Sequence, residues 1–536
     1  MTYLVITPLT VFGTPQTIFL RLKKSGLLHI NLLESVQPSH IVESENLEPL
    51  PQWSYITGPA LATLKSLDTG AALYLINNSN SNSIDSNINN IYINNNNINN
   101  NNINNNNINT NNIDNNNEKI LKKWSDPFEA IRDVLKRINT INIVSQNEIN
   151  TSSYAIPSTG LNFTSGLVGY LGYDLVRSIE CLPTTAVADA ELANLYLYVC
   201  DHVLAYDHTQ QVWYFCTMNL TGLFENNINR STVWDNTLNA AHCTFLNENI
   251  VSEAALPTFI VGTPTFKTTA SNYLQQAESV LEYIRAGDIL QANLSHRVEG
   301  SFTGDSFALY QALTVANPAP YSAYIEIDDC AIVSVSPEQF LQVQHRQITA
   351  KPIKGTRPRH HELKDDQASK NALKNSLKDR AENVMIVDLM RNDIGRVAEI
   401  GSVKVKYLFE IEPHPSVWQM VSTVTAALHT SQDTVDLLKA CWPPGSMTGA
   451  PKIRAMEIID TLEPVRRGVY AGAIGYFNHT GSVDLSVVIR TAIVAKERVS
   501  VQVGGAVVAD SNPQAELNET YIKGKKIFEV LGWQIG

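Results

Sequence analysis

The sequence lacks the features that would place it in a membrane, outside the cell or on nucleic acid. No uninterrupted apolar stretch reaches the ~18 residues expected of a membrane span, and no basic segment precedes the first apolar run, Leu4–Ile6. The net charge of −12 provides no basic field for nucleic acid. Six cysteines are widely spaced without a Cys-x-x-Cys motif, which indicates reduced, buried thiols. We therefore expect a cytoplasmic protein.

Three nucleotide or nucleophile motifs are also missing. Gly-x-Gly-x-x-Gly is absent, and the three glycines spaced by three in 166–172 indicate close backbone packing of a strand instead. The stretch Gly445–Lys452 resembles a phosphate loop but lacks the Gly-Lys-Ser/Thr ending, and Pro451 removes a backbone N–H. Because this stretch leads into a helix, it favours a small anion over a nucleotide. No cysteine lies in a Gly-x-Cys-x-Gly elbow, so we predict no glutaminase activity.

The segment 348–359 is the most informative part of the chain. It places four cations and two hydroxyls within a dozen residues, and two prolines and Gly355 restrict its backbone to a specific shape. Lys354 lies at its centre, and Glu338 follows the preceding strand-like run 330–335. An amine and an acid arranged in this way suit a nucleophile and a proton donor. On these residues alone, a basic hairpin tip with an incidental glutamate is an equal alternative.

Two predicted helices each carry a pair of acids three residues apart. The first, from about 373 to 394, is apolar on more than one side and is predicted to be buried, yet it contains Asp379 and Glu382. The second, from Pro513 to about 531, contains Glu516 and Glu519. For one helix alone a solvated face is the simpler interpretation. Two such pairs favour a Mg²⁺ site, since Mg²⁺ prefers a few carboxylate oxygens.

We predict two regions, 1–260 and 261–536, joined through a polar linker at 219–257. More than half of residues 77–117 are asparagine. Such a tract buries too little apolar surface to offset its ordering entropy, so we predict a disordered insertion. An interaction tract is the alternative.

Deleting 79–116 is accordingly expected to leave folding and activity nearly unchanged. Turnover and thermal unfolding of the deleted chain would check this, and a collapse of either would show that the tract is structural.

The ordered motifs together resemble the chorismate-utilising enzymes of the anthranilate synthase component I type. The resemblance is strong over 265–531 and weaker before it. It is carried by the following segments: 287–294 (GDILQANL), 336–338 (SPE), the loop around Lys354, 379–383 (DRAEN), 445–452, 484–491 (DLSVVIRT), and 504–523. It implies an α+β fold with two large antiparallel sheets packed orthogonally, outer helices, and an active site between the sheets.

Within this family, the resemblance implies the branch that combines chorismate with ammonia to give 4-amino-4-deoxychorismate, on the route to 4-aminobenzoate and folate. The decisive residue is Lys354, where the anthranilate-forming branch usually has alanine. That branch is the alternative. Lys354 would attack C2 of chorismate while Glu338 protonates the leaving C4 oxygen, and we expect Lys351 and Arg357 to favour a neutral Lys354. Gln291 replaces the lysine of the water-using branches, and an amide cannot deprotonate water.

The resemblance also implies the remaining site residues. Mg²⁺ would be bound directly by Glu382 and Glu519, and through water by Asp379 and Glu516. The metal would hold the ring carboxylate beside Gly504 and Gly505. The residues implied to hold the enolpyruvyl carboxylate or line the site are Arg490, Lys523, Tyr470, Thr356 and Thr448.

Two further implications concern partners and ligands. Ammonia would come from a separate glutamine amidotransferase subunit. The segments 32–35 and 317–321, with Ser35, Pro320 and Tyr321, match a tryptophan pocket of relatives, and an empty pocket is the alternative. One departure from the family is Gln419, which stands where histidine is common.

Overall fold

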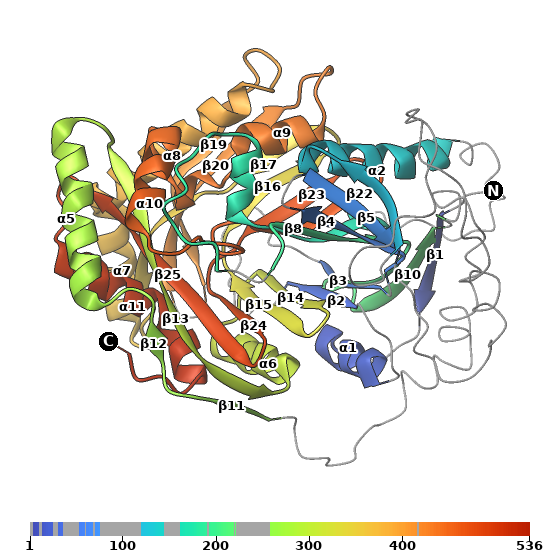
Figure 1. Ribbon diagram of the computed structural model, residues 1–536, viewed down its shortest axis with the longest axis horizontal. Helices are drawn as coiled ribbons and strands as arrows, with labels where there is room; N and C mark the ends of the chain where they lie inside the picture. Colours follow the sequence, from blue (N-terminus) through green and yellow to red (C-terminus); the bar gives the residue numbers. More distant parts are fainter. Residues whose placement is uncertain are drawn as a thin grey trace, which may run out of the picture.

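The computed structural model describes residues 4–9, 13–24, 30–35, 53–58, 60–67, 70–75, 119–143, 161–189, 192–218, 220, 258–414 and 417–535. The asparagine-rich segment and nearly all of the predicted linker lie outside these residues. Within them, the chain forms two large sheets whose named strands all pair antiparallel, with helices outside (Figure 1). The predicted α+β class with two large antiparallel sheets is confirmed.

The first sheet includes a long antiparallel pair, β13 (Gln291–Gly304) and β25 (Arg498–Val508), near one of its ends. Its order is β1 (Leu4–Leu9), β10 (Val212–Met218), β9 (His202–Asp207), β3 (Trp53–Thr57), β2 (Asn31–Glu34), β14 (Tyr321–Ile327), β15 (Cys330–Ser336), β24 (Thr491–Ala495), β25, β13 and β11 (Phe259–Val261). Two short strands, β12 (Thr265–Phe266) and β21 (Gly449–Ala450), also pair with β13.

The second sheet carries the lysine segment at one end. Its order is β18 (Ile353–Pro358), β20 (Val417–Ala427), β17 (Gln347–Ala350), β16 (Gln339–Gln344), β23 (Val483–Val487), β22 (Ala473–Asn478), β7 (Gly166–Leu171), β8 (Leu195–Cys200), β4 (Ala62–Leu67), β5 (Gly70–Leu75) and β6 (Lys119–Trp124), and β19 (Lys404–Pro413) pairs with β20. Both sheets contain strands from each side of residue 260, so the two sequence regions share one pair of sheets.

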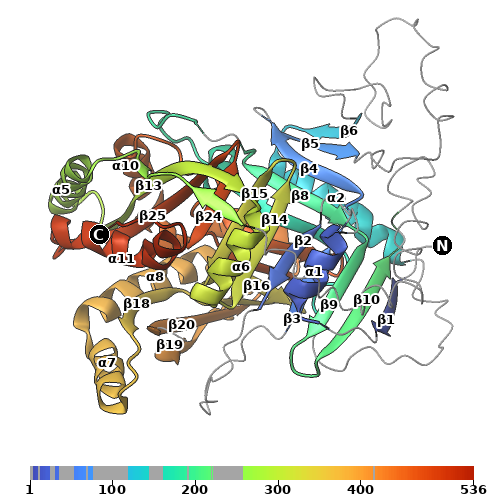
Figure 2. The ribbon, with the colours of Figure 1, turned by 90° about the horizontal axis from the view of Figure 1, so that it is seen from below.

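Aromatic side chains fill the space between the sheets. Tyr55 on β3 of the first sheet contacts Tyr476 on β22 of the second, with ring centroids 5.5 Å apart. Helices cover the outer faces, as Figure 2 shows for α1 (Pro15–Lys24) and α6 (Ser306–Ala316) on the first sheet. The second sheet is covered by α2 (Pro127–Ile143), α8 (Leu377–Gly395) and α9 (Thr434–Cys441). The paired strands β13 and β25 are covered by α5 (Ala270–Ala286), α10 (Lys452–Leu462) and α11 (Pro513–Val530).

Local sequence signals account for several helix ends. Asp126 accepts a hydrogen bond from the N–H of Phe128 at the start of α2, as expected of a cap. Gly287 ends α5 at φ 82°, a left-handed conformation that glycine adopts readily. Among the described ranges, no helix is both long and apolar enough to cross a bilayer.

Three predictions about the described residues were wrong. The helix expected from about 373 to 394 spans the end of α7 (Leu363–Asn375) and nearly all of α8, because the Ser376 side chain accepts the N–H of Asp379 and starts a new helix. The α8 helix is also not buried all round, since Leu377 and Val384 are 81% and 46% exposed. The five described cysteines are free thiols, but Cys181 is exposed and not buried.

Candidate active site

Lys354 lies on β18 at an irregularity in the sheet. The pairing of β18 with β20 shifts between Ile353 and Thr356. Gly355 has φ 89°, and a Cβ atom there would lie 2.9 Å from the Cβ of Asp379 on α8. A side chain at this position is therefore excluded both by the backbone conformation and by α8. The restricted backbone shape predicted for this segment is what brings β18 against α8.

The amine of Lys354 and the carboxyl group of Glu338 meet at one residue, Ser446. The Lys354 Nζ donates to the Ser446 carbonyl oxygen at 3.2 Å, and the Ser446 side chain hydrogen-bonds Glu338. Ser446 belongs to the short helix η3 (Gly445–Met447) and is 5% exposed, and Glu338 is 6% exposed. The two groups are close enough for each charge to act on the other.

Burial shifts both groups toward their neutral forms. It lowers the pKa of Lys354, with Lys523 as the next cause. It also raises the pKa of Glu338, although Ser446 and Lys354 act in the opposite direction. A neutral amine beside a protonated acid is the state that nucleophilic attack with proton donation requires.

The lowered pKa of Lys354 agrees with the prediction, but the neighbours named as its cause were wrong. Arg357 donates to Asp379 at 2.6 Å, and the charge of Lys351 acts on Asp484. The lysine that acts on Lys354 is Lys523 on α11, far away in the sequence.

The four predicted metal acids lie on the facing helices α8 and α11. Glu516 is 2% exposed, and its Oε1 accepts hydrogen bonds from Ser511 at 2.6 Å and Lys378 at 3.3 Å. Among the described residues, its Oε2 has no partner. Glu519 pairs with Lys523 at 2.8 Å, which together with nearby lysines lowers its pKa against the effect of burial. Burial raises the pKa of Glu382, and Glu519 adds to this increase.

The acids do not form a closed metal cage as they stand. In the described part of the chain, no three His, Cys, Asp or Glu side chains gather closely enough to enclose a metal ion. Asp379 is held by Arg357, and the ammonium groups of Lys378 and Lys523 lie against Glu516 and Glu519. Their chemistry nevertheless fits Mg²⁺, because they offer only oxygen ligands and Glu516 keeps one buried oxygen unpaired.

Gly504 and Gly505 on β25 lie between the predicted metal acids and two of the residues predicted to hold the enolpyruvyl carboxylate, Tyr470 and Lys523. A Cβ atom at Gly504 would lie 2.8 Å from the Tyr470 hydroxyl, and one at Gly505 would lie 3.6 Å from Glu516 Oε2. Lys523 Nζ donates to the Gly504 carbonyl at 3.3 Å. A side chain at position 504 would displace the Tyr470 hydroxyl. This part of β25 therefore lies between Tyr470 and the acids.

The other predicted residues lie on elements that border this region. Arg490 has φ 50°, and its charge acts on Glu338. Gln291, at the start of β13, is completely buried, and neither of its side-chain polar atoms has a partner within the described residues. The buried Thr448 accepts the Asn293 N–H at 2.7 Å through its carbonyl. Thr356 is exposed on β18, opposite Gln419 on β20.

Sequence reasoning missed two residues of this site. Ser446 lies inside the noted stretch 445–452, but nothing in that pattern pairs it with Lys354 and Glu338. Lys378 lies four residues before Glu382, a spacing that places both on one helix face and could have been noticed.

The comparisons with known proteins agree with this geometry. The model of the family described as chorismate binding enzyme matches residues 101–529. The chain belongs to this family.

Relatives in the chorismate binding enzyme family include two component 1 proteins with different names. Aminodeoxychorismate synthase component 1 of Salmonella typhimurium is 41% identical over 70% of this chain and 78% of its own length. Anthranilate synthase component 1 of Bacillus subtilis is 36% identical over 77% of this chain and 82% of its own length. Among solved structures, anthranilate synthase component I from Streptococcus pneumoniae TIGR4 superposes with a TM-score of 0.65 at 25% identity, covering 92% of this chain and 95% of that one.

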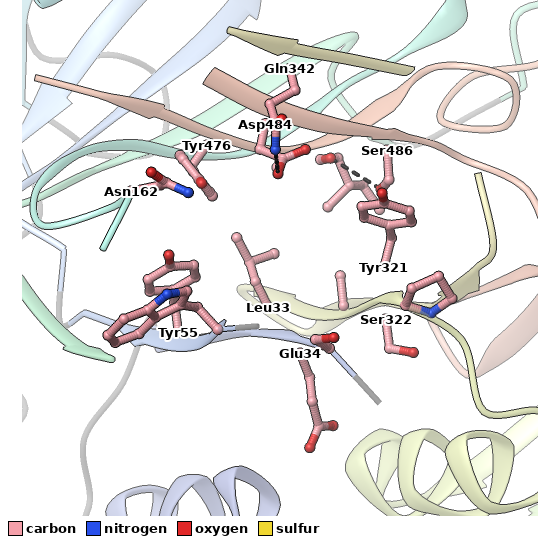
Figure 3. Close-up of a pocket in the computed structure, with 16 residues that line it drawn as sticks. Leu33, Glu34, Tyr55, Asn162, Tyr321, Ser322, Gln342, Tyr476, Asp484 and Ser486 are labelled. Atoms are coloured by element: carbon pink, nitrogen blue, oxygen red, sulfur yellow. Dashed lines mark hydrogen bonds between the residues drawn. The ribbon is translucent and has the colours of Figure 1, made fainter. Parts of the chain in front are cut away.

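This chorismate binding enzyme also contains a cavity between its two sheets, apart from Lys354 (Figure 3). It comprises roughly 600 Å³ including its mouth, and Ser35, Pro320 and Tyr321 all line it. The carboxylate of Glu34 accepts hydrogen bonds from Gln16 and Tyr310 and points away from the cavity.

Asp484, on the opposite wall of this cavity, is a second carboxylate. It accepts hydrogen bonds from Gln339 at 3.2 Å and Gln342 at 3.0 Å. Burial raises its pKa to about 6 against the effect of these glutamines and Lys351.

Proposed function

We propose that the chain is an aminodeoxychorismate synthase component 1, which converts chorismate and ammonia to 4-amino-4-deoxychorismate, the precursor of 4-aminobenzoate and folate. The observation that carries this proposal is the pair of the half-buried Lys354 and the buried Glu338, which meet at Ser446. The names of relatives at 38–41% identity support it. A lysine at this position provides a nucleophile that formation of anthranilate does not require.

The proposed chemistry is a double displacement at an allylic system. The neutral amine of Lys354 bonds to C2 of chorismate, both conjugated ring double bonds shift by one position, and the C4–oxygen bond breaks. Glu338 gives its proton to the departing oxygen, which leaves as water. Ammonia then bonds to C4, both double bonds shift back, and the C2–nitrogen bond breaks to release Lys354 as an amine. The new C4 ammonium returns a proton to Glu338, so the enzyme is restored.

The acids on α8 and α11 would serve substrate binding. Glu382 and Glu519 would hold Mg²⁺ directly, and Asp379 and Glu516 would act through water. When bound, Mg²⁺ would supply positive charge for the ring carboxylate of chorismate. The unpaired buried oxygen of Glu516 supports a cation here.

The cationic side of the site would hold the other carboxylate. The enolpyruvyl carboxylate would be bound by Arg490, Lys523 and Tyr470. The charge of Arg490 interacts with that of Glu338, and the Lys523 Nζ donates a hydrogen bond to the Gly504 carbonyl oxygen. Thr356, Thr448 and Gln291 would line the ring. Because the Gln291 amide cannot take a proton from water, ammonia and not water is the expected nucleophile at C4.

We infer that ammonia reaches this chain from a separate glutamine amidotransferase subunit. The designation "component 1" of the relatives supports a second component. The chain lacks a Gly-x-Cys-x-Gly elbow of its own. We also retain the cytoplasm as the expected compartment.

The test of the activity is incubation of the purified chain with chorismate, Mg²⁺ and concentrated ammonium, followed by chromatographic separation of the products. We expect a 4-amino-4-deoxychorismate peak. An anthranilate peak in its place would favour the alternative branch.

We further propose that the cavity between the sheets binds tryptophan. Its aromatic lining, including Tyr55 and Tyr476, suits an indole ring, and Asp484 would face the ammonium group (Figure 3).

This assignment predicts a pH dependence. Because the pKa of Asp484 is about 6, its charge is mostly absent at pH 5 and present at pH 7.5. Tryptophan affinity, measured by titration calorimetry, should therefore rise about tenfold between these values. An Asp484→Asn variant should bind more weakly at pH 7.5 and lose this rise. Equal affinity at both pH values in the unsubstituted protein would contradict the role of Asp484, and no heat of binding would contradict the site.

A further inference from the structure

One lysine lies between the acids of the two facing helices. Lys378 is the second residue of α8, and its Nζ lies 3.3 Å from Glu516 Oε1 and 3.9 Å from Glu382 Oε1. Glu382 is on the same helix, whereas Glu516 is on α11, 138 residues away along the chain. A single ammonium group thus connects two carboxylates that belong to the proposed Mg²⁺ site.

This ammonium satisfies the acids only partly. Glu516 is almost fully buried, and its Oε1 is occupied by Ser511 and Lys378. Its Oε2 has no hydrogen-bond partner among the described residues. A buried carboxylate oxygen without a partner is costly, so the site has acceptor capacity that Lys378 does not use.

The lysine itself is free to leave. Its side chain is 50% exposed, whereas those of Glu382 and Glu516 are 14% and 3% exposed. The acids are therefore held inside the protein, and the cation lies at the solvent boundary. A metal ion bound by the same oxygens would repel an ammonium group within a few ångströms, and the half-exposed chain can swing into water.

We propose that Lys378 is an internal cation that occupies the acidic site in the metal-free protein and competes with Mg²⁺ for Glu382 and Glu516. This inference rests on the metal site of the proposed function. Lys378 keeps the buried acids neutralised before the metal binds and lowers the affinity of the free enzyme for divalent cations. It is a positioning residue, because its contacts are with the acids and not with the reacting atoms.

The test is divalent cation binding to the full chain without chorismate. Mn²⁺ is the probe, its free concentration is followed by electron paramagnetic resonance, and Mg²⁺ is compared by calorimetry. We expect Lys378→Met, which keeps the length of the aliphatic chain, to bind Mn²⁺ about tenfold more tightly. The matched control is Lys374→Met on α7, an exposed lysine whose loss changes the net charge equally. It should bind Mn²⁺ like the unsubstituted chain.

A second readout separates competition from general stabilisation. Without metal, Lys378→Met should melt at a lower temperature because Glu516 loses a partner, and added Mg²⁺ should raise its melting temperature by more than that of the unsubstituted chain. If Lys378 only forms a stabilising ion pair, Lys378→Met should melt at a lower temperature, but Mg²⁺ should not raise its melting temperature by more than that of the unsubstituted chain.

The outcomes distinguish this inference from the function on which it rests. Unchanged or weaker Mn²⁺ binding by Lys378→Met, with normal binding by the unsubstituted chain, would overturn the competition and leave the metal site intact. Binding by Lys378→Met alone would support it strongly. Binding by neither protein would overturn both the metal site and this inference, whereas the Lys354 chemistry would still be judged by its own product assay.

Discussion

Replacement of Lys354 by methionine is expected to reduce the formation of 4-amino-4-deoxychorismate by roughly 10³-fold or more, because the amine that forms the covalent bond is lost. Methionine keeps the apolar volume of the side chain, so the fold should survive. The effect should appear in kcat, since Lys354 acts on the ring after chorismate is bound.

The covalent step can be observed directly. With chorismate and Mg²⁺ but no ammonia, the unsubstituted chain should gain the mass of chorismate minus one water, and peptide mapping should place this mass on Lys354. Lys374→Met should behave like the unsubstituted chain. Normal formation of 4-amino-4-deoxychorismate by Lys354→Met would exclude the lysine as nucleophile.

Replacement of Glu338 by glutamine is expected to lower kcat about 10²- to 10⁴-fold, the usual range for loss of a general acid. Glutamine has nearly the same shape and can accept a hydrogen bond from Ser446, but it has no proton to give. Chorismate binding should change little.

The dependence on pH provides a sharper test of Glu338. Its role requires the protonated carboxyl group, so activity should fall as pH rises through its raised pKa. Lys354 must be neutral, so activity should fall as pH decreases through the lowered pKa of that lysine. The pair should give a bell-shaped profile whose two limbs belong to the coupled groups. Glu338→Gln should lose the limb at higher pH, and the exposed Glu362→Gln should keep it. An unchanged pH profile in Glu338→Gln would show that another group is the general acid.

The chemistry-bearing residues were largely visible in the sequence because their signals are local. The restricted backbone around Lys354 follows from Gly355 and from the prolines at 352 and 358. The placement of Glu516 and Glu519 on one helix face follows from helix periodicity. Ser376, in contrast, was not recognised as a helix start, so one buried helix was predicted from about 373 to 394, across the end of α7 and the start of α8. The side-chain cap at Ser376 outweighed the continuous pattern.

The contacts that activate the site could not be found in this way. Lys354 and Ser446 are 92 residues apart, and Lys378 and Glu516 are 138 residues apart. Their meeting depends on the pairing of strands and on the tertiary arrangement that brings Lys378 near the start of α8 to Glu516 near the start of α11. For the same reason, Lys351 and Arg357, which each lie three residues from Lys354 in the sequence, were wrongly named as the neighbours that act on it.

The sequence by itself determined the residue types and the local backbone: a lysine in a restricted turn, an acid at a strand end, and two helices with paired carboxylates. Those features depend only on near neighbours along the chain, and the family was indicated by the resemblance of the ordered motifs together. The tertiary structure decided which of these groups are buried and which charges face them. Burial shifts Lys354 and Glu338 toward their neutral forms, and packing places Lys378 between two acids. Both effects arise from removing water around groups that are distant in sequence, which no local pattern specifies.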